Sequence, residues 1–383
     1  MNTEEEKNIQ PTDEENAVDA VVEEPNDDGF TDEIIKPAPV TENEENPSEE
    51  AKPAEEVLPE DAEVVEEPEV EIPETNYESE IYDPRFDAIE NARKQWNGSY
   101  RKASRIRFVV NTVVLVAILA GWLVPTLTMK DAGMVPLYIG LACAGVGIAI
   151  LLIYGHFNNK KNKEQIANYF NAYFTNINSY TLEDFGVKDI QGDVNSKITK
   201  EEFLESGVFD KIAAIGSRDN IVFNYKGMDC AMAEAAAQVD AGKSLATVFV
   251  GKYLRTHNEV EVSDEGLVIY FSGNDRALPP AKLKELHITE TNSRYKVYGK
   301  STDKKVLTKK VREALARIRT NSLLVDITIV IKSGRTYWYL GYEDDLMVLP
   351  NDKHFDSRYV REYKDQLELV LEASLLLNGH LHD

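Results

Sequence analysis

Two long runs without any ionisable side chain constrain this chain more than any other feature. Residues 108–128 read FVVNTVVLVAILAGWLVPTLT and residues 135–155 read VPLYIGLACAGVGIAILLIYG. A helix rises about 1.5 Å per residue, so each run extends roughly 30 Å, the thickness of the hydrocarbon layer of a bilayer. A soluble hairpin is rarely apolar on every side over such a length. The sequence therefore predicts two transmembrane helices.

The charged flanks of these runs predict their orientation. Only MKDAG, residues 129–133, separates the runs, so the helices must form an antiparallel hairpin. Short loops rich in Lys and Arg stay in the cytoplasm. We therefore expect a multi-pass cell-membrane protein with both termini cytoplasmic and the turn outside, and we expect the flanking bases to contact anionic lipid. These bases are Arg101, Lys102, Arg105 and Arg107 before the first run, and Lys160, Lys161 and Lys163 after the second.

Small residues recur at four-residue spacing in both runs. Ala117 and Gly121 form one such pair, Gly140 and Ala144 a second, and Gly145 and Ala149 a third. Small side chains let helix backbones approach closely. They predict either packing of the hairpin on itself or, in addition, self-association. With no ionisable group inside either run, the hairpin is expected to act as an anchor rather than a conduit.

Residues 1–80 are strongly acidic. They contain 30 Asp and Glu against 3 Lys, whereas the rest of the chain holds 37 acids and 39 bases, so the formal net charge of -25 belongs to this segment. Repelling charges and few apolar side chains predict a disordered tail. Short aliphatic clusters such as Val64-Val65 are possible docking motifs, although a solvated spacer is the favoured interpretation. The near-neutral remainder argues against a nucleic-acid partner.

The segment 83–107 predicts a basic, amphipathic juxtamembrane helix. Asp83 followed by Pro84 is a helix start, Phe86, Ile89 and Trp96 share one face, and Gly98 is expected to end the helix. Such a helix suits either the membrane–water interface or the surface of the folded domain, and both options remain open. Beyond the second run, apolar residues keep helical spacing over 156–180, which predicts a helical stalk.

Residues 181–383 predict one cytoplasmic α+β domain with a mainly antiparallel sheet. Thr199 and Glu202 form a capping box before a short helix that ends at Gly207. Ser333-Gly334 joins two β-rich runs into a hairpin, and 228–239 pairs with the run before Lys226-Gly227, although its alanines also allow a helix. Alternation predicts one buried strand face, made of Val325, Ile327, Ile329 and Ile331. Helical spacing predicts one buried helix face, made of Val306, Leu307, Val311, Leu315 and Ile318.

No catalytic, cofactor-binding or metal-binding set emerges from the sequence. Gly242-Lys243-Ser244 lacks the earlier glycine and the following helix of a phosphate-binding loop, so a β-turn is favoured. The histidines lack metal-ligand spacing, and Asp344-Asp345 is expected to face solvent. Cys143 and Cys230 predict two separate thiols. The clearest surface feature is a basic patch whose natural partner is an acidic surface, including the chain's own tail; it comprises Lys304, Lys305, Lys309, Lys310 and Arg312.

The order of these parts resembles an uncharacterised bacterial family of two-helix membrane proteins. The motifs that carry the resemblance are FLESGVFDK, DNIVFNYKGMDCAMAEA, KSLATVFVGKYLR, RYKVYGKSTDKKVLTKKVREAL and VDITIVIKSGRTYWYL, behind the membrane hairpin. The resemblance implies a bacterial cytoplasmic membrane and supplies no catalytic residues.

Three functions follow as hypotheses. The leading one is a non-enzymatic, membrane-anchored interaction or scaffold domain that binds a protein partner or a second copy of itself. The alternatives are a membrane-proximal sensor of a small molecule or lipid headgroup, and a hydrolase-type enzyme whose site is assembled from distant segments.

Overall fold

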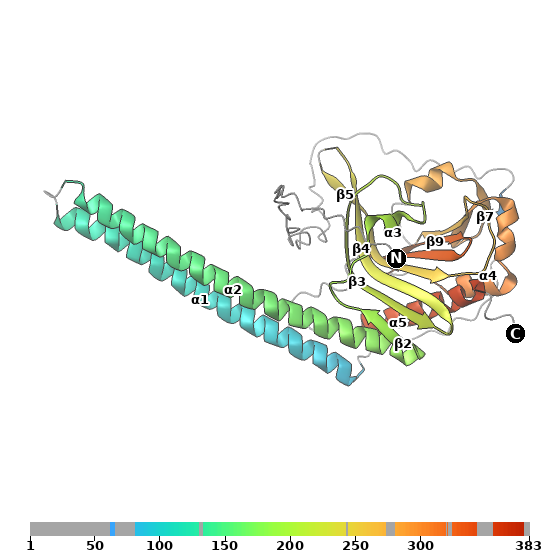
Figure 1. The fold of residues 1–383 in the computed structure, drawn as a ribbon, viewed down its shortest axis with the longest axis horizontal. Coiled ribbons are helices and arrows are strands. Elements are labelled where there is room, and N and C mark those ends of the chain that lie inside the picture. Colours follow the sequence, from blue (N-terminus) through green and yellow to red (C-terminus); the bar gives the residue numbers. More distant parts are fainter. Residues whose placement is uncertain are drawn as a thin grey trace, which may run out of the picture.

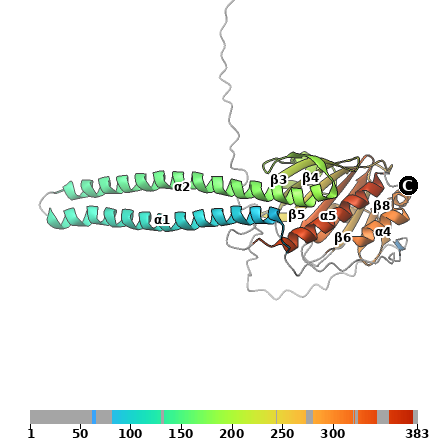
Figure 2. The same ribbon diagram turned by 90° about the horizontal axis from the view of Figure 1, so that it is seen from below.

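The computed structural model describes residues 62–65, 81–129, 133–242, 244–272, 280–318, 320, 324–342 and 355–378. Two long antiparallel helices extend from one side of a domain built on a single curved sheet (Figures 1 and 2). The predicted fold class, an α+β domain with a mainly antiparallel sheet attached to a helical hairpin, is confirmed.

Helix α1 runs unbroken from Pro84 to Thr128, and α2 runs from Val135 to Thr181. Asp83 caps α1 as predicted, because its side chain accepts a hydrogen bond from the Arg85 N–H at 2.8 Å. The predicted end at Gly98 is wrong. The apolar face on either side of Gly98 keeps packing on α2, so one glycine does not stop the helix. The predicted stalk over 156–180 is part of α2.

Both helices are long and apolar enough to span a membrane. Their apolar side chains between Phe108 and Phe157 are mostly exposed, as expected of surfaces that contact lipid. Some of the small residues lie between the helices. A Cβ built on Gly121 would stand 2.5 Å from the Cys143 Sγ, and one on Gly140 would stand 2.6 Å from the Trp122 ring, whereas Gly145 has open space around it. Gly121 and Gly140 therefore pack the hairpin on itself, and Gly145 faces outward.

The sheet of the domain has ten strands in the order β1-β7-β8-β6-β9-β10-β5-β4-β3-β2. All neighbouring pairs are antiparallel except β1 and β7, which run parallel. The strands are β1 (Glu63–Val64), β2 (Lys188–Gly192), β3 (Ile212–Tyr225), β4 (Met228–Asp240), β5 (Leu245–His257), β6 (Leu267–Ser272), β7 (Ile288–Thr291), β8 (Tyr295–Gly299), β9 (Leu324–Lys332) and β10 (Arg335–Tyr342).

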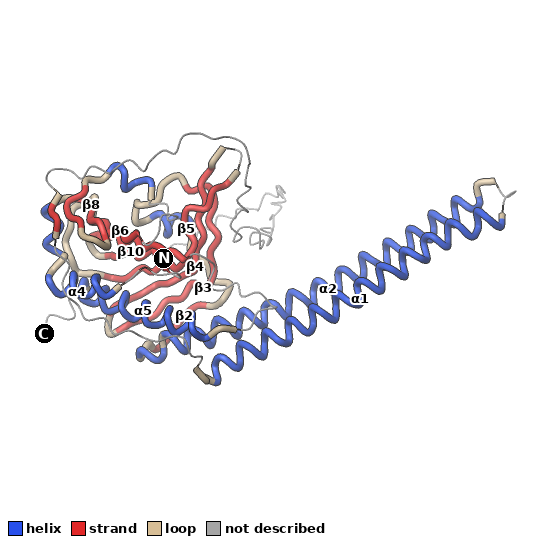
Figure 3. The backbone as a smooth tube through the Cα atoms, turned by 180° about the vertical axis from the view of Figure 1, so that it is seen from behind, coloured by secondary structure: helices blue, strands red, loops and turns tan. Residues whose placement is uncertain are grey.

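The remaining elements are short helices and one long helix that cover the sheet (Figure 3). They are η1 (Glu183–Phe185), α3 (Lys200–Leu204), η2 (Ala281–Glu285), η3 (Ser301–Val306), α4 (Lys309–Arg317) and α5 (Ser357–Leu377). The capping box of Thr199 and Glu202 is present at the start of α3, and the predicted apolar face of the 306–318 segment is buried.

Both faces of the sheet are covered, which the sequence pattern did not indicate. Ile327, Ile329 and Ile331 of β9 join a core with α4 and α5, as predicted for one face. Val330 on the opposite face is equally buried and packs with Phe203 of α3. Val325 is only partly buried. A single buried face was therefore too simple an expectation for this strand, because helices lie on both sides of it.

The predicted hairpins are present. Lys226 and Gly227 both have positive φ in the turn between β3 and β4, and Ser333-Gly334 joins β9 to β10. The alanine-rich 228–239 segment is the strand β4, not a helix. The turn from β4 to β5 contains Gly242 and leads into a strand, as the β-turn interpretation required, while Lys243 lies outside the described residues.

The acidic segment 1–80 lies mostly outside the described residues. Residues 62–65 are described, and they correct the expectation of a solvated spacer at this point, because β1 pairs with the edge of the sheet.

Candidate functional site

The membrane-facing helices join the domain through an aromatic cluster. Phe86 of α1 packs on Tyr180 of α2 and on Phe355, with ring centroids 4.8 and 5.3 Å apart. Trp96 stacks on Tyr169 at 5.3 Å, and Ile89 is fully buried in the same cluster. The apolar face predicted for 83–107 therefore packs on the stalk and on the domain. Of the two options left open by the sequence, domain packing is the one present.

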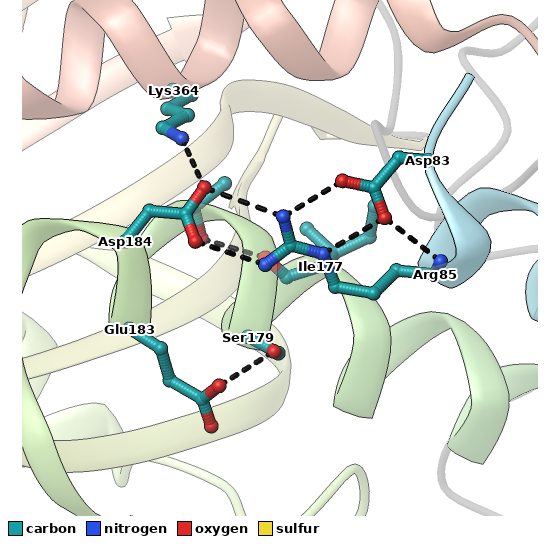
Figure 4. Close-up of polar contacts among 8 residues, drawn as sticks. Asp83, Arg85, Ile177, Ser179, Glu183, Asp184 and Lys364 are labelled. Atoms are coloured by element: carbon teal, nitrogen blue, oxygen red, sulfur yellow. Dashed lines mark hydrogen bonds and ion pairs between the residues drawn. The ribbon is translucent and has the colours of Figure 1, made fainter.

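A network of ion pairs closes the same junction (Figure 4). The Arg85 guanidinium lies 2.7 Å from the Asp83 carboxylate and 3.0 Å from that of Asp184, just beyond the end of α2. Lys364 of α5 lies 2.6 Å from the other oxygen of Asp184. Burial opposes the charge of Asp184, but Arg85 and Lys364 hold its pKa below the usual range. Arg85 and Lys364 also lie over the Tyr180 ring, at 4.8 and 4.2 Å. The network ties α1, α2 and α5 together.

A buried ion pair anchors α1 to the segment before α5. The Arg93 Nε donates to the Glu90 Oε2 at 2.7 Å, and both side chains are less than one-tenth exposed. The same Glu90 oxygen accepts a hydrogen bond from the Phe355 N–H at 3.3 Å. Removing one partner of such a pair leaves an uncompensated buried charge, so the contact fixes the helix in place.

Four charged side chains lie on the sheet near the stalk; Asp219, Glu234 and Lys252 are buried, and the Arg218 side chain is 11% exposed. Arg218 and Asp219 come from β3, Glu234 from β4 and Lys252 from β5. Arg218 Nε lies 3.0 Å from Glu234 and 3.8 Å from Asp219, and Lys252 Nζ lies 3.9 Å from Glu234. The Arg218 guanidinium also lies 5.4 Å from the centre of the Phe170 ring of α2. We call these four residues the buried quartet.

Asp219 is the most perturbed carboxyl group of the quartet. Burial, opposed by Lys252 and reinforced by the neighbouring carboxylate of Glu234, raises its pKa to about 7. Its backbone is left-handed, with φ 55°, at a register shift between β3 and β4. This local geometry turns the Asp219 side chain toward Glu234 instead of letting it alternate to solvent.

The junction consists of packed rings and ion pairs that connect the stalk to the sheet and to α5. Among the described residues no three His, Cys, Asp or Glu side chains group as metal ligands. Burial raises the pKa of the Cys230 thiol to about 12, so it stays protonated, and neither cysteine forms a disulfide. Asp344-Asp345, His354, His380 and His382 lie outside the described residues.

The predicted basic patch contacts the chain's own tail. Lys304 Nζ lies 2.5 Å from Glu63 of β1, as anticipated for an acidic segment folding back. Arg312 pairs with the buried Glu290 of β7, and Lys309 lies 3.7 Å from Glu313. The patch is therefore partly neutralised within the molecule.

Sequence reasoning did not find the buried quartet. Glu234 interrupts a run of alanines in β4, and Lys252 stands between the apolar stretch Val248–Val250 and Tyr253-Leu254 of β5. A charged side chain inside a buried strand must be paired with another charge or polar group. Charged residues within predicted strands were therefore the sequence signal for this site. The identity of the partner depends on strand register, which only the fold provides.

Comparison of the chain with protein-family models, with curated proteins and with solved structures found no match.

Proposed function

We propose that this chain is a membrane-anchored interaction or scaffold protein, in which the hairpin holds the α+β domain at a fixed position on the cytoplasmic face of a membrane. One observation carries the proposal. Helices α1 and α2 continue without a break from their apolar stretches into the junction with the domain. An unbroken helix pair bound by buried contacts at its base transmits position and orientation, which a flexible linker does not.

The register of the two helices supports a level for the membrane surface. Tyr154 donates to the Ala103 carbonyl at 3.3 Å, and Trp96 stacks on Tyr169, so these contacts fix which levels of α1 and α2 lie side by side. The flanking bases, Arg101 to Arg107 and Lys160 to Lys163, lie at the domain-side ends of the two apolar stretches. All seven are exposed. We call them the basic belt. It supports contact with anionic headgroups.

The belt also supports the proposed orientation, because basic flanks favour the cytoplasm. From Arg107 at the apolar boundary to Trp96 at the junction, α1 advances about 16 Å at about 1.5 Å per residue. The domain would therefore lie close to the membrane surface but clear of the headgroups. The resemblance to the bacterial two-helix family fits this arrangement, and we propose a bacterial cytoplasmic membrane as its location.

The orientation is tested with added-cysteine variants of the full chain in a Cys143→Ala background, in which the remaining Cys230 is buried. Met129→Cys, at the end of α1, should react with an impermeant maleimide in intact cells. Lys284→Cys, exposed on the domain, should react only after the cells are opened. Labelling in the opposite order would overturn the orientation.

The interaction role is tested by crosslinking and co-purification from the native membrane, followed by identification of the partner. A crosslink that maps to the domain, and that weakens when Lys304, Lys305 and Lys309 are changed to Glu, supports the role. Recovery of the same partners in the same amounts from this variant and from a chain lacking residues 1–60 would count against it.

A further inference from the structure

The outer edge of the sheet is occupied by the chain's own N-terminal segment. Glu63 and Val64 lie beside Glu290 and Thr291, and β1 runs parallel to β7. The Val65 N–H donates to the Thr291 carbonyl at 3.0 Å. In Figure 1, β7 lies on the side of the domain away from the helical hairpin. The strand β1 therefore lies on the side of the domain away from the hairpin.

Side-chain contacts on both sides hold this short strand. Ala62 is partly buried and packs on the core cluster that includes Leu283 and Ile288. Glu63 pairs with Lys304, and this contact holds the pKa of Glu63 below its usual value. Ala62 therefore contacts apolar side chains, and Glu63 contacts a basic side chain, beside the edge strand β7.

The domain presents its half of this contact on fixed elements. Lys304 Nζ also lies 3.4 Å from the Thr289 carbonyl of β7, and its side chain is only 18% exposed, against 63% for Glu63. Arg312, which pairs with Glu290 of β7, also donates to the Leu307 carbonyl at 2.9 Å. The basic side chains are therefore placed along β7 by contacts within the domain, and Glu63 is the more exposed partner.

An exposed edge strand leaves backbone groups unpaired and readily accepts a further strand. Many domains use such an edge to bind an extended peptide, with backbone hydrogen bonds for affinity and side-chain contacts for selectivity. Here β1 takes that place for β7. Val64 is 74% exposed, so a strand with a small apolar side chain followed by a carboxylate, as in Ala62-Glu63, is the ligand that the edge and its lysine would select.

The N-terminal segment contains twice a five-residue sequence whose second copy begins within the docked strand. Residues 64–68 read Val-Val-Glu-Glu-Pro, and residues 21–25, outside the described residues, read the same five letters. In both copies Asp-Ala stands shortly before the two valines, and Pro ends the segment, where a residue without an N–H stops strand pairing. Ala20 stands immediately before the first copy, whereas Glu63 stands immediately before the second. The first copy therefore lacks the carboxylate that reaches Lys304.

We propose that the outer edge of β7, flanked by Lys304, is a strand-docking site for the Val-Val-Glu-Glu-Pro segments of this protein. The second segment occupies it within the same chain, and the first is a weaker ligand for the same edge. The docked segment guards the edge against other strands. This deepens the proposed function, on which it rests, by naming the surface through which the domain binds.

The backbone contact is tested with the full chain in lipid nanodiscs. Val65→Pro removes the N–H that bonds to Thr291, and Val57→Pro is the matched control outside the docked strand. Amide exchange over residues 62–65 should be slowed several-fold in the wild type and in the control relative to the unstructured rate. In Val65→Pro the remaining amides of this segment should exchange at the unstructured rate. Absence of protection in the wild type would overturn docking.

Ligand selectivity is tested with fluorescent peptides of residues 60–69 and 17–26. A tethered segment competes at an effective concentration in the millimolar range. The 60–69 peptide should therefore bind Val65→Pro at least tenfold more tightly than the wild type or Val57→Pro, and the 17–26 peptide should bind more weakly. If a scrambled 60–69 peptide binds Val65→Pro equally well, the site has no strand selectivity and the proposal fails.

The charge contact is tested by exchanging its partners. Lys304→Glu and Glu63→Lys should each reduce the protection of residues 62–65, and the double variant should restore it. Loss of protection that is not restored would show that the pair does not select the strand. The orientation tests are independent of these outcomes. Failure of the maleimide experiment would contradict the proposed function, whereas failure of the charge exchange would contradict only the proposed docking site on β7.

Discussion

Asp219 shows how one buried carboxyl group makes the stability of this protein depend on pH. Its folded-state pKa of about 7 lies above the usual value of 3.8. The folded state therefore binds a proton more tightly than the unfolded state. Its contribution favours folding at low pH and is lost as pH rises from about 4 to about 7, by up to about 1.4 kcal/mol per pH unit.

Asp219→Asn should remove this dependence. The amide keeps the size of the side chain, tolerates the left-handed backbone and carries no charge. We expect the variant to gain thermal stability relative to the wild type at pH 8, and to lose that advantage at pH 5. Asp189→Asn is the control, since Asp189 has φ 57° and is exposed. Equal differences at both pH values in thermal denaturation would contradict the expectation.

Gly251 shows a steric requirement of the sheet. It pairs with Gly341 across β5 and β10, and a Cβ built on it would stand 1.9 Å from the Leu340 carbonyl oxygen. Backbone cannot yield as a flexible side chain does.

Gly251→Ala should therefore cost about 1–3 kcal/mol of unfolding free energy or more. Gly98→Ala, in α1 with open space around it, should be neutral or stabilising by up to about 1 kcal/mol. Chemical denaturation of the two variants measures the contrast. Similar midpoints for both would show that β5 and β10 can separate without cost.

At the scale of elements, the junction decides whether the helices and the domain move as one body. Phe86 is 6% exposed between Tyr180 and Phe355. Phe86→Ala removes the ring from a packed site, a change that commonly costs 3–5 kcal/mol in a core. Because the cluster lies outside the main core of the sheet, we expect the loss to appear as local opening.

Hydrogen exchange should then accelerate at residues 173–181 and 355–360, while β9 and β10 keep their protection. Tyr100→Ala, at an exposed position on α1, is the control. Unchanged exchange at the junction in the Phe86 variant would mean that the ion pairs of Asp83, Arg85, Asp184 and Lys364 hold the helices by themselves.

At the scale of the whole molecule, the orientation that we propose rests on the basic belt. Replacing its seven Lys and Arg residues with Gln leaves the apolar stretches long enough to insert but removes the charge bias that orients them. We expect mixed orientation, seen as maleimide labelling of both Met129→Cys and Lys284→Cys in intact cells. Changing Lys282, Lys284 and Lys296 of the domain to Gln should leave labelling at Met129→Cys alone. A single orientation without the belt would contradict the prediction.

The local elements could be predicted from the sequence because their causes are local. Uncharged length defines the two spans, Asp83-Pro84 and Asp356-Ser357 start helices, and Lys226-Gly227 and Ser333-Gly334 turn the strands. The helix end predicted at Gly98 was wrong because a glycine ends a helix only where packing does not continue beyond it. The strand β1 was missed because its two residues gain stability only from β7, more than two hundred positions away in the chain.

The sequence by itself determined the hairpin, its charged belt and the antiparallel character of the domain, since hydrophobic length, charge and turn chemistry act over a few residues. Only the tertiary structure decided what the juxtamembrane face packs on, which four charges share the buried quartet, and where Glu63 finds Lys304. Those contacts join residues that are remote in the chain. Their free energy depends on burial and strand register, and neither exists until the whole sheet has formed.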